Sequence, residues 1–218
     1  MIGLRRGDVR LFEHNKEWKI EGERTVNELR KMLGSDTVDI QHVGSTSIKS
    51  IKAKPIIDIA VGTDDFNRIL SHEAELLKAG YHYRPNHDMG GAQLLFACGS
   101  YYEGGDMQTH FVHIVKYNSM QWRNYINFRD FLNAFPEKAK QYESVKTGLV
   151  EKLGSVGSRN GYVEGKAEFI SRILRKATAW SFLGKTVTME TDRPIGYVHR
   201  KSGYELVYPL NYGYIPGV

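Results

Sequence analysis

Hydrophobic and polar residues alternate in two distinct patterns along the first third of the chain. Residues 15–33 repeat apolar positions at helical spacing on one face, and the Gly-Ser pair at 34–35 ends that pattern. Two short apolar runs, residues 37–43 and 56–61, are typical of β-strands. Residues 46–51, which follow a Gly-Ser turn, predict a short helix between them.

The same patterns continue as far as residue 182. Asp64 or Asp65 can cap a helix that runs to Leu77 and ends near Gly80. The later elements that we expect are strands at 93–98 and 108–115, joined as a hairpin by the Gly-rich segment 99–105, and helices at 119–134, 136–153 and 161–182. Helices before and after a sheet predict an α+β (mixed α/β) fold, with a mixed sheet flanked by helices.

The character of the sequence changes at Leu183-Gly184, where a helical pattern gives way to β-type residues. Residues 185–191 alternate apolar and polar positions, which favours a strand. We therefore predict a domain at 1–182 and a short, β-rich C-terminal segment at 183–218.

Composition favours a soluble protein of the cytoplasm. A chain of 218 residues with 41% hydrophobic and 25% charged residues suits one domain, or one domain with an appendage. No apolar run approaches the ~20 residues of a membrane span, and the N-terminus carries no apolar signal segment. The single cysteine, Cys98, excludes an internal disulfide and a cysteine zinc site. We expect a cytoplasmic location and no membrane partner.

The charge balance gives a weaker indication of partners. The net charge is +5 and the pI is about 9.1, which favours anionic ligands. The 30 basic and 25 acidic residues are well mixed, however, and no basic-aromatic platform stands out. Nucleic acid is therefore not an expected partner.

The candidate chemistry lies in the stretch HVGSTSIKSIKAKPIIDIAVG, residues 42–62. Asp58 stands between isoleucines in a strand-like run, where a carboxylate is costly to bury unless a cation or donors compensate it. Gly44 allows close backbone approach, and Ser45 offers a hydroxyl beside free N–H groups. The two features together look like half of a nucleoside-triphosphate site, with phosphates on the turn and a metal on the acid.

The spacing in this stretch resembles a known signature. Gly44-Ser45, twelve residues and then Asp58 resembles the nucleotidyltransferase fold, in which a Gly-Ser turn precedes acids on the next strand. The longer text resembles the GrpB family of that superfamily, whose pattern is roughly His-Val-Gly-Ser-Thr-Ser/Ala-Val-Pro-Gly-Leu-x-Ala-Lys-Pro-Ile-Ile-Asp-Ile. Residues 42–47 and 53–59 follow it closely. The resemblance implies a nucleotidyltransferase-like core that binds a nucleoside triphosphate with Mg²⁺ and transfers a nucleotidyl group to an unidentified acceptor.

Two departures from the pattern leave enzymatic activity open. Lys49-Ser50 replaces Pro-Gly, so we expect a different loop between turn and strand. Ala60 occupies the position where such enzymes usually carry a second acid on the same strand face. One carboxylate can hold one Mg²⁺ through water and phosphate oxygens, whereas two-metal transfer needs more ligands. The alternative is a non-catalytic nucleotide- or phosphate-binding accessory module.

The resemblance extends to a histidine-containing strand. The family text resembles Arg-Thr-His-His-Leu-His-Val, and this chain has Gln108-Thr-His-Phe-Val-His-Ile. His110 and His113 are three residues apart, so on a regular strand they point to opposite faces. Either can replace the missing acid as a ligand or catalytic base, although a strand histidine is more often structural. Asp106 is a further candidate metal ligand if the hairpin brings it near Asp58.

Two lysines are candidate phosphate ligands. Lys54 is either a solvated lysine or one whose ammonium approaches the triphosphate. Lys166 has the Tyr-x-x-x-Lys spacing with Tyr162, one helical turn apart. Most helical lysines and arginines are solvated, and we expect the same of Arg129 and Lys146.

The C-terminal segment carries a separate resemblance. Residues 208–215, Tyr-Pro-Leu-Asn-Tyr-Gly-Tyr-Ile, resemble an early motif of family I inorganic pyrophosphatases. In that family the metal-binding aspartates come after this motif, and here the chain stops. The resemblance implies a truncated pyrophosphatase-like segment at 183–218. A pyrophosphate-related role, or a partner chain that pairs with its open strand edges, is a third hypothesis.

Overall fold

The chain divides into two compact parts. The computed structural model describes residues 1–87, 90–156 and 159–216. One part comprises Met1–Trp180 and the other Ser181–Val218. The first part contains the main sheet and its helices, and the second contains two small hairpins.

The first part contains strands, α-helices and short 3-10 turns. The strands are β1 (Leu4–Arg5), β2 (Asp39–Val43), β3 (Ile57–Thr63), β4 (His82–Tyr83), β5 (Gln93–Cys98), β6 (Met107–Gln108) and β7 (His110–Lys116). The helices are α1 (Lys16–Leu33), α2 (Phe66–Ser71), α3 (Glu73–Lys78), α4 (Met120–Ala134), α5 (Pro136–Leu153), α6 (Arg159–Gly165) and α7 (Ala167–Ser181). Short 3-10 turns are η1 (Gly34–Asp36), η2 (Ser45–Ser47), η3 (Pro85–His87) and η4 (Ser100–Glu103).

Local sequence signals explain where the long helices begin and end. The Asn15 side chain accepts a hydrogen bond from the Glu17 amide and caps α1, which ends at Gly34 with a φ of +50°. The Ser119 hydroxyl accepts from the Trp122 amide at the start of α4. Pro136 occupies the first turn of α5, where its missing N–H costs nothing.

The main sheet is mixed, as the sequence predicts. Among the described residues its order is β2-β3-β7-β5-β4; β3 and β7 are parallel and the other neighbouring pairs are antiparallel. The β5–β7 pair confirms the predicted hairpin. The register places Asp58 of β3 beside Val43 of β2 and Phe111 of β7.

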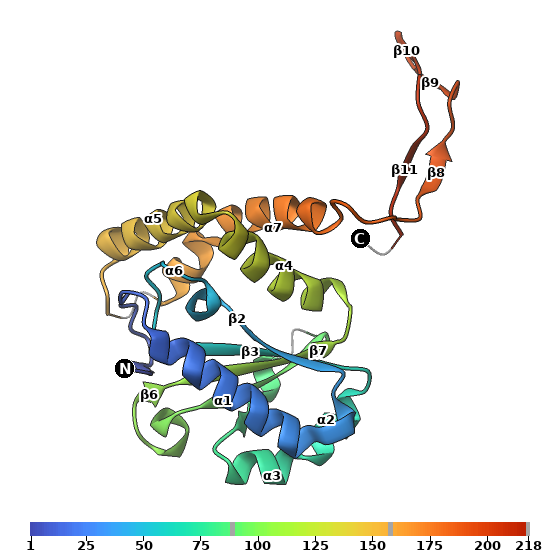
Figure 1. Ribbon diagram of the computed structural model, residues 1–218. Coiled ribbons are helices and arrows are strands. Elements are labelled where there is room, and N and C mark those ends of the chain that lie inside the picture. The colour runs from blue at the N-terminus through green and yellow to red at the C-terminus, as the bar shows by residue number, and fades with distance from the viewer. Residues whose placement is uncertain (88–89, 157–158, 217–218) are drawn as a thin grey trace. The chain divides into compact units, whose positions relative to one another are not determined.

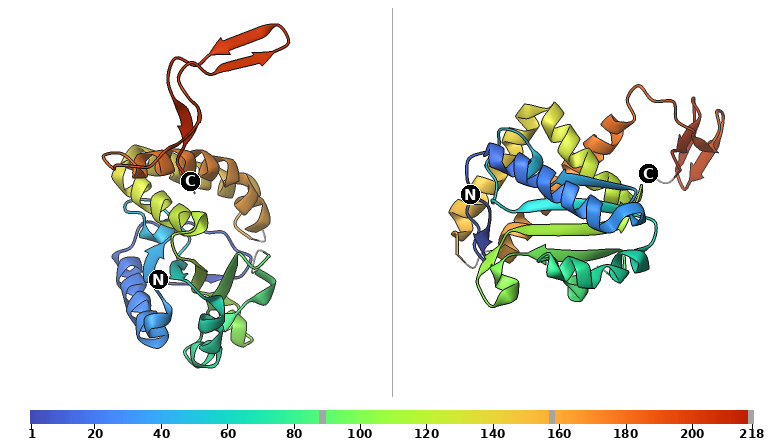
Figure 2. Two further views of the ribbon diagram at one scale, coloured as in Figure 1. Left: turned by 90° about the vertical axis from the view of Figure 1, so that its right-hand side faces the viewer. Right: turned by 60° about the horizontal axis from the view of Figure 1, so that its bottom comes forward.

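Helices cover both faces of this sheet, which confirms the predicted fold class (Figure 1). On one face α1, α2 and α3 pack on the inward side chains of the strands, and Figure 2 shows these layers from two further sides. On the other face α4 packs through Trp122 against Val43, Ala60 and Val115. A further hydrophobic core lies among α4, α5, α7 and the segment that follows η2. Its buried residues are Ile48, Ile51, Phe131, Leu132, Ala139, Tyr142, Phe169, Ile173 and Ala177.

Several predicted boundaries differ from the structure. The helix expected up to Leu77 is two helices that meet at His72. The helix expected over 161–182 is likewise divided, with Lys166 between α6 and α7. The expected helix at 46–51 is only the 3-10 turn η2, because Ile48 already has extended backbone. The two-residue strand β4 is too short to give a pattern.

The second part consists of two antiparallel pairs. β9 (Val198–Lys201) pairs with β10 (Tyr204–Val207), and β8 (Glu190–Arg193) pairs with β11 (Tyr212–Tyr214). Most of its apolar side chains are exposed. Residues 217–218, at the end of the predicted segment, lie outside the described residues.

Among the described helices, none combines the length and apolar composition needed to cross a bilayer.

A buried lysine is the main anomaly of the helical core. Lys146 of α5 has a relative exposure of 0%, whereas we expected it to be solvated. Its ammonium donates to the Lys52 carbonyl and lies 4.6 Å from the centroid of the Tyr142 ring. Burial, reinforced by the positive charge of Lys166, lowers the pKa of Lys146 to about 7. The helix therefore carries an amine that loses its charge close to neutral pH.

Helix α1 approaches the sheet through a glycine. A Cβ on Gly22 would lie 2.3 Å from Nδ1 of His42, whereas a Cβ on Gly148 of α5 would meet no atom within 4 Å. We expect Gly22→Ala to lower the free energy of unfolding by about 1–3 kcal/mol through overpacking. Gly148→Ala should raise it by up to about 1 kcal/mol through helix propensity. Urea denaturation measures both, and equal effects of the two substitutions would contradict this packing.

The buried lysine predicts a pH dependence of stability. Between pH 7 and 10.5 the folded state has Lys146 mostly neutral while the unfolded state keeps it charged. The unfolded state then binds more protons, so this group makes the free energy of unfolding rise with pH. Lys146→Met should remove that rise, about 4 kcal/mol over the range.

The measurement is urea denaturation at several pH values for wild type and Lys146→Met. Lys152→Met, an exposed lysine at the end of the same helix, is the matched control and should keep the wild-type slope. Parallel curves for wild type and Lys146→Met would show that Lys146 stays charged.

Candidate functional site

The carboxylate of Asp58 lies against the turn that follows β2. Because Val43 pairs with Asp58, the next residue, Gly44, turns directly over that side chain. Gly44 has a φ of +70°, and a Cβ there would lie 2.4 Å from Oδ2 of Asp58. The position therefore requires glycine both for its left-handed backbone and for space. The Asp58 side chain is 30% exposed, so it is neither sealed in the core nor free in solvent.

Hydrogen bonds hold the turn in place. The Ser47 hydroxyl donates to the Gly44 carbonyl at 2.6 Å. The Thr46 hydroxyl donates to the Ile56 carbonyl at 3.2 Å and lies 3.0 Å from Nε2 of His42. Burial lowers the pKa of His42 to about 4, which favours a neutral ring in this contact with Thr46. These bonds leave Ser45 directed to a cleft.

Two pockets meet at Ser45, Asp58 and Lys166 and form one cleft. The larger, of about 330 Å³, is named the aromatic lobe here, and the smaller, of about 120 Å³, the lysine lobe. The aromatic lobe is lined chiefly by Tyr125, Phe128, Tyr142, Ile170 and Leu174, with the amides of Gln121 and Asn124. The lysine lobe is lined by Ser45, Lys54, Ile56, Asp58, Phe111, Tyr162 and Lys166.

The two predicted lysines converge on one ring. The ammonium groups of Lys54 and Lys166 lie 5.5 and 5.0 Å from the centroid of the Tyr162 ring. Burial, followed by the charge of Lys166, lowers the pKa of Lys54 to about 8, and Asp58 opposes that shift. The lysine lobe thus holds one carboxylate and two amines, one of which is close to losing its proton.

The two candidate histidines lie on opposite faces of the sheet, as the strand periodicity predicts. Nε2 of His113 is 3.5 Å from Oδ1 of Asp58, and the His113 ring packs 5.1 Å from that of Tyr125. Nε2 of His110 is instead 3.1 Å from Oε1 of Glu21 on α1. Burial lowers the pKa of His110 despite this carboxylate. His110 therefore does not reach the cleft, although the sequence made it an equal candidate.

The structure does not bring Asp106 to Asp58 either. Asp106 is exposed, precedes β6 and forms an ion pair with Arg5 at 3.4 Å. Among the described residues, no group of three or more His, Cys, Asp or Glu side chains could hold a metal ion. Asp58, with His113 beside it, is the carboxylate of the cleft lining among the described residues. It suits a Mg²⁺ ion that brings phosphate and water ligands, and it does not suit a metal held by protein alone or a two-metal centre.

Sequence reasoning missed two structural supports of the cleft. Arg129 of α4 donates to the Gln41 side chain at 2.8 Å and to the His42 carbonyl at 3.0 Å, so it is partly buried rather than solvated. Tyr142 of α5 packs behind the aromatic lobe and covers Lys146. Helical spacing alone gives no sign of either contact.

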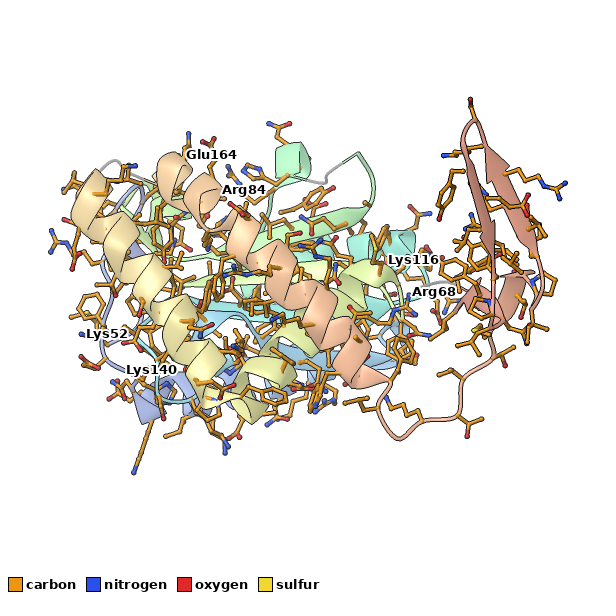
Figure 3. The ribbon with its side chains drawn as sticks, turned by 90° about the horizontal axis from the view of Figure 1, so that it is seen from above. Lys52, Arg68, Arg84, Lys116, Lys140 and Glu164 are labelled. Atoms are coloured by element: carbon orange, nitrogen blue, oxygen red, sulfur yellow. The ribbon has the colours of Figure 1, made fainter. Side chains whose placement is uncertain are left out.

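Lys52 and Lys140, labelled in Figure 3, line a separate surface hollow with Glu143.

The comparisons with known proteins agree with the sequence resemblance. The family model described as "GrpB protein" matches residues 8–176. The "Glutamate-rich protein GrpB" of Alkalihalophilus pseudofirmus is 37% identical over 81% of this chain and 99% of its own length. The "UPF0157 protein YqkA" of Bacillus subtilis is 27% identical over 79% of this chain and 48% of its own length.

Structural similarity gives the same result. The crystal structure of the conserved protein GrpB from Enterococcus faecalis matches with a TM-score of 0.71 and 25% identity, over 79% of this chain and 99% of that one. A cytoplasmic RNA terminal U-transferase matches at a TM-score of 0.40 and 14% identity, over 69% of this chain and 47% of that one. At that level the match does not establish a shared fold.

The family model ends at residue 176, before the C-terminal part. The resemblance of residues 183–218 to an inorganic pyrophosphatase therefore stays unsupported. The family model and the 37% identity over nearly the whole of a relative show the family of the main domain. The chain belongs to the GrpB family.

Proposed function

We propose that the cleft binds a nucleoside triphosphate, with the base in the aromatic lobe and the phosphates in the lysine lobe. The observation that carries this proposal is the position of Asp58 and Ser45 where the two lobes meet. Aromatic walls with a few amides suit a planar base, and a volume of about 330 Å³ is in the range of small-molecule sites. The amines of Lys54 and Lys166 suit phosphate oxygens.

Mg²⁺ enters this proposal together with the phosphates. Asp58 would hold it, and the ion would neutralise part of the triphosphate charge. Mg²⁺ usually keeps several waters and binds through one or two carboxylates plus substrate phosphates, which agrees with a cleft that offers one carboxylate. Lys54 and Lys166 would contact the remaining phosphate charge on the other side of Ser45.

Calorimetric titration with ATP, GTP, CTP and UTP in the presence of Mg²⁺ tests the binding proposal. Wild type should bind at least one of them, and Asp58→Asn should weaken that binding at least tenfold, about 1.4 kcal/mol. Asp64→Asn removes an exposed acid beyond β3 and is the matched control, which should bind as wild type does.

Two results would contradict the binding proposal: no nucleotide bound by folded wild type, or undiminished binding by Asp58→Asn. A titration in the presence of EDTA separates Mg²⁺-dependent binding from metal-independent binding. Binding that survives chelation would assign the cleft to a metal-independent nucleotide module.

A second candidate function, nucleotidyl transfer, is favoured by the place of His113 beside Asp58 in the aromatic lobe. In that reaction the acceptor oxygen forms a bond to the α-phosphorus, and the bond from the α-phosphorus to the bridging oxygen breaks. Pyrophosphate leaves, and His113 takes the acceptor proton. General-base catalysis typically contributes ~10²–10⁴-fold. Ala60, buried beside Asp58, leaves this strand face with one acid.

Pyrophosphate release tests the transfer reaction, with water and glycerol as acceptor probes. We expect His113→Gln to lower the rate about 100-fold or more while nucleotide affinity changes less than threefold. His199→Gln, which changes a histidine of β9 that lines neither lobe, should release pyrophosphate at the wild-type rate. Nucleotide binding without any pyrophosphate release by wild type would reject transfer to these probes and favour the non-catalytic module.

A further inference from the structure

Three arginines from distant segments line one small pocket, which shares Phe111 with the lysine lobe. Arg6 follows β1, Arg84 follows β4 and is labelled in Figure 3, and Arg159 begins α6. Tyr101 and Tyr102 of η4 form part of the wall, together with His87, Leu95, Gln108 and Phe111. Because no neighbouring pair of these arginines is close in sequence, their convergence is a property of the fold.

Each guanidinium lies over an aromatic ring. The Cζ atoms of Arg6 and Arg84 are 4.2 and 5.2 Å from the ring centroids of Tyr101 and Tyr102. That of Arg159 is 5.9 Å from the centroid of Phe111. A guanidinium stacked by its face keeps its N–H groups at the edge, where they can donate to an anion. The aromatic contacts therefore orient the arginines and leave their donors available.

No acid lines the arginine pocket within the part of the chain that the structure describes. Among the described residues no ion pair joins an acid to Arg6, Arg84 or Arg159, whereas the neighbouring Arg5 is paired with Asp106. All three guanidiniums act electrostatically on the Tyr102 phenol, which places them round the same point. Gln108 donates to the Tyr102 hydroxyl at 2.7 Å and fixes that wall. Within residues 1–87, 90–156 and 159–216, these three cations have no ion-pair partner and line one pocket, which suits an anion.

This arginine pocket and the lysine lobe are neighbours. The Phe111 side chain lines both of them. Arg159 contributes to the lowered pKa of Lys54, so its charge also reaches the lysine lobe. A ligand that spanned the lysine lobe and the arginine pocket would have to pass beside Phe111.

We propose that Arg6, Arg84 and Arg159 bind the phosphate group of a second, phosphorylated ligand beside the cleft. This rests on the proposed function of the cleft. Three forked donors match the several oxygens of a phosphate better than the two of a carboxylate. A nucleic-acid base is disfavoured here, because Tyr101 and Tyr102 already stack with guanidiniums and Tyr102 also stacks with His82, at 5.5 Å.

The test compares binding of inorganic phosphate and ribose 5-phosphate by calorimetry at fixed ionic strength. Wild type should bind both saturably and should not bind ribose. Arg6→Gln/Arg84→Gln should weaken both at least tenfold and change nucleotide affinity less than twofold. Lys54→Gln/Lys166→Gln should weaken nucleotide binding at least tenfold and change the affinity for the two phosphate probes less than twofold. Arg30→Gln/Lys31→Gln removes two exposed charges at the end of α1, outside both pockets, and should bind phosphate as wild type does.

Thermal denaturation checks that each variant is folded. If Arg6→Gln/Arg84→Gln is not folded, Arg84→Lys replaces it in the binding experiment. It keeps the charge and loses the fork, so it should weaken phosphate binding at least threefold. The proposal is overturned if folded wild type binds neither probe, if Arg6→Gln/Arg84→Gln binds them normally, or if the α1 control loses as much affinity. Binding of inorganic phosphate without ribose 5-phosphate would overturn the assignment to a phosphorylated compound.

These outcomes are separable from a failure of the proposed function. If wild type binds ribose 5-phosphate through the arginines but no nucleoside triphosphate, the phosphate pocket stands and the nucleotide assignment of the cleft is rejected. If nucleotides bind and the phosphate probes do not, the nucleotide assignment of the cleft stands and the phosphate pocket is rejected.

Discussion

The contact between Gly44 and the Asp58 carboxylate is the constraint on which the cleft depends. Antiparallel pairing places Val43 beside Asp58, so the chain must turn immediately over the acid. A left-handed glycine makes that turn without a Cβ that would collide with the carboxylate. The same turn directs Ser45 into both lobes. A register shift of one residue would move Asp58 to the α1 face of the sheet and abolish the site.

Local signals in the sequence were sufficient for much of the fold. The helical spacing of apolar residues over 15–33 and the apolar strand runs predict elements that the structure contains. The Gly-Ser motif and Asp58 could be joined in advance because they sit on consecutive segments of an antiparallel pair. Tertiary contacts could not be predicted in this way: Lys146 is buried because α5 packs over the Lys52 carbonyl, and helical spacing does not show that partner.

The two-residue periodicity of β7 separates structural chemistry from cleft chemistry. His110 points to α1 and pairs with Glu21, whereas His113, an odd number of residues later, points to Asp58. The sequence gives this alternation but not which face is open. That depends on the helices: Gly22 lets α1 close tightly over its face, while α4 and the break at Lys166 leave space on the other.

Burial and charge together explain why the cleft suits an anionic ligand. The protein places Lys54 and Lys166 side by side against Tyr162, and their mutual repulsion adds to the cost of burying Lys54. One carboxylate, Asp58, offsets only part of this cost. A phosphate between the amines would replace repulsion with attraction and return a full charge to Lys54. Ala60, at the position of a second acid, also favours an anionic ligand. A carboxylate there would repel the phosphates that the lysines attract.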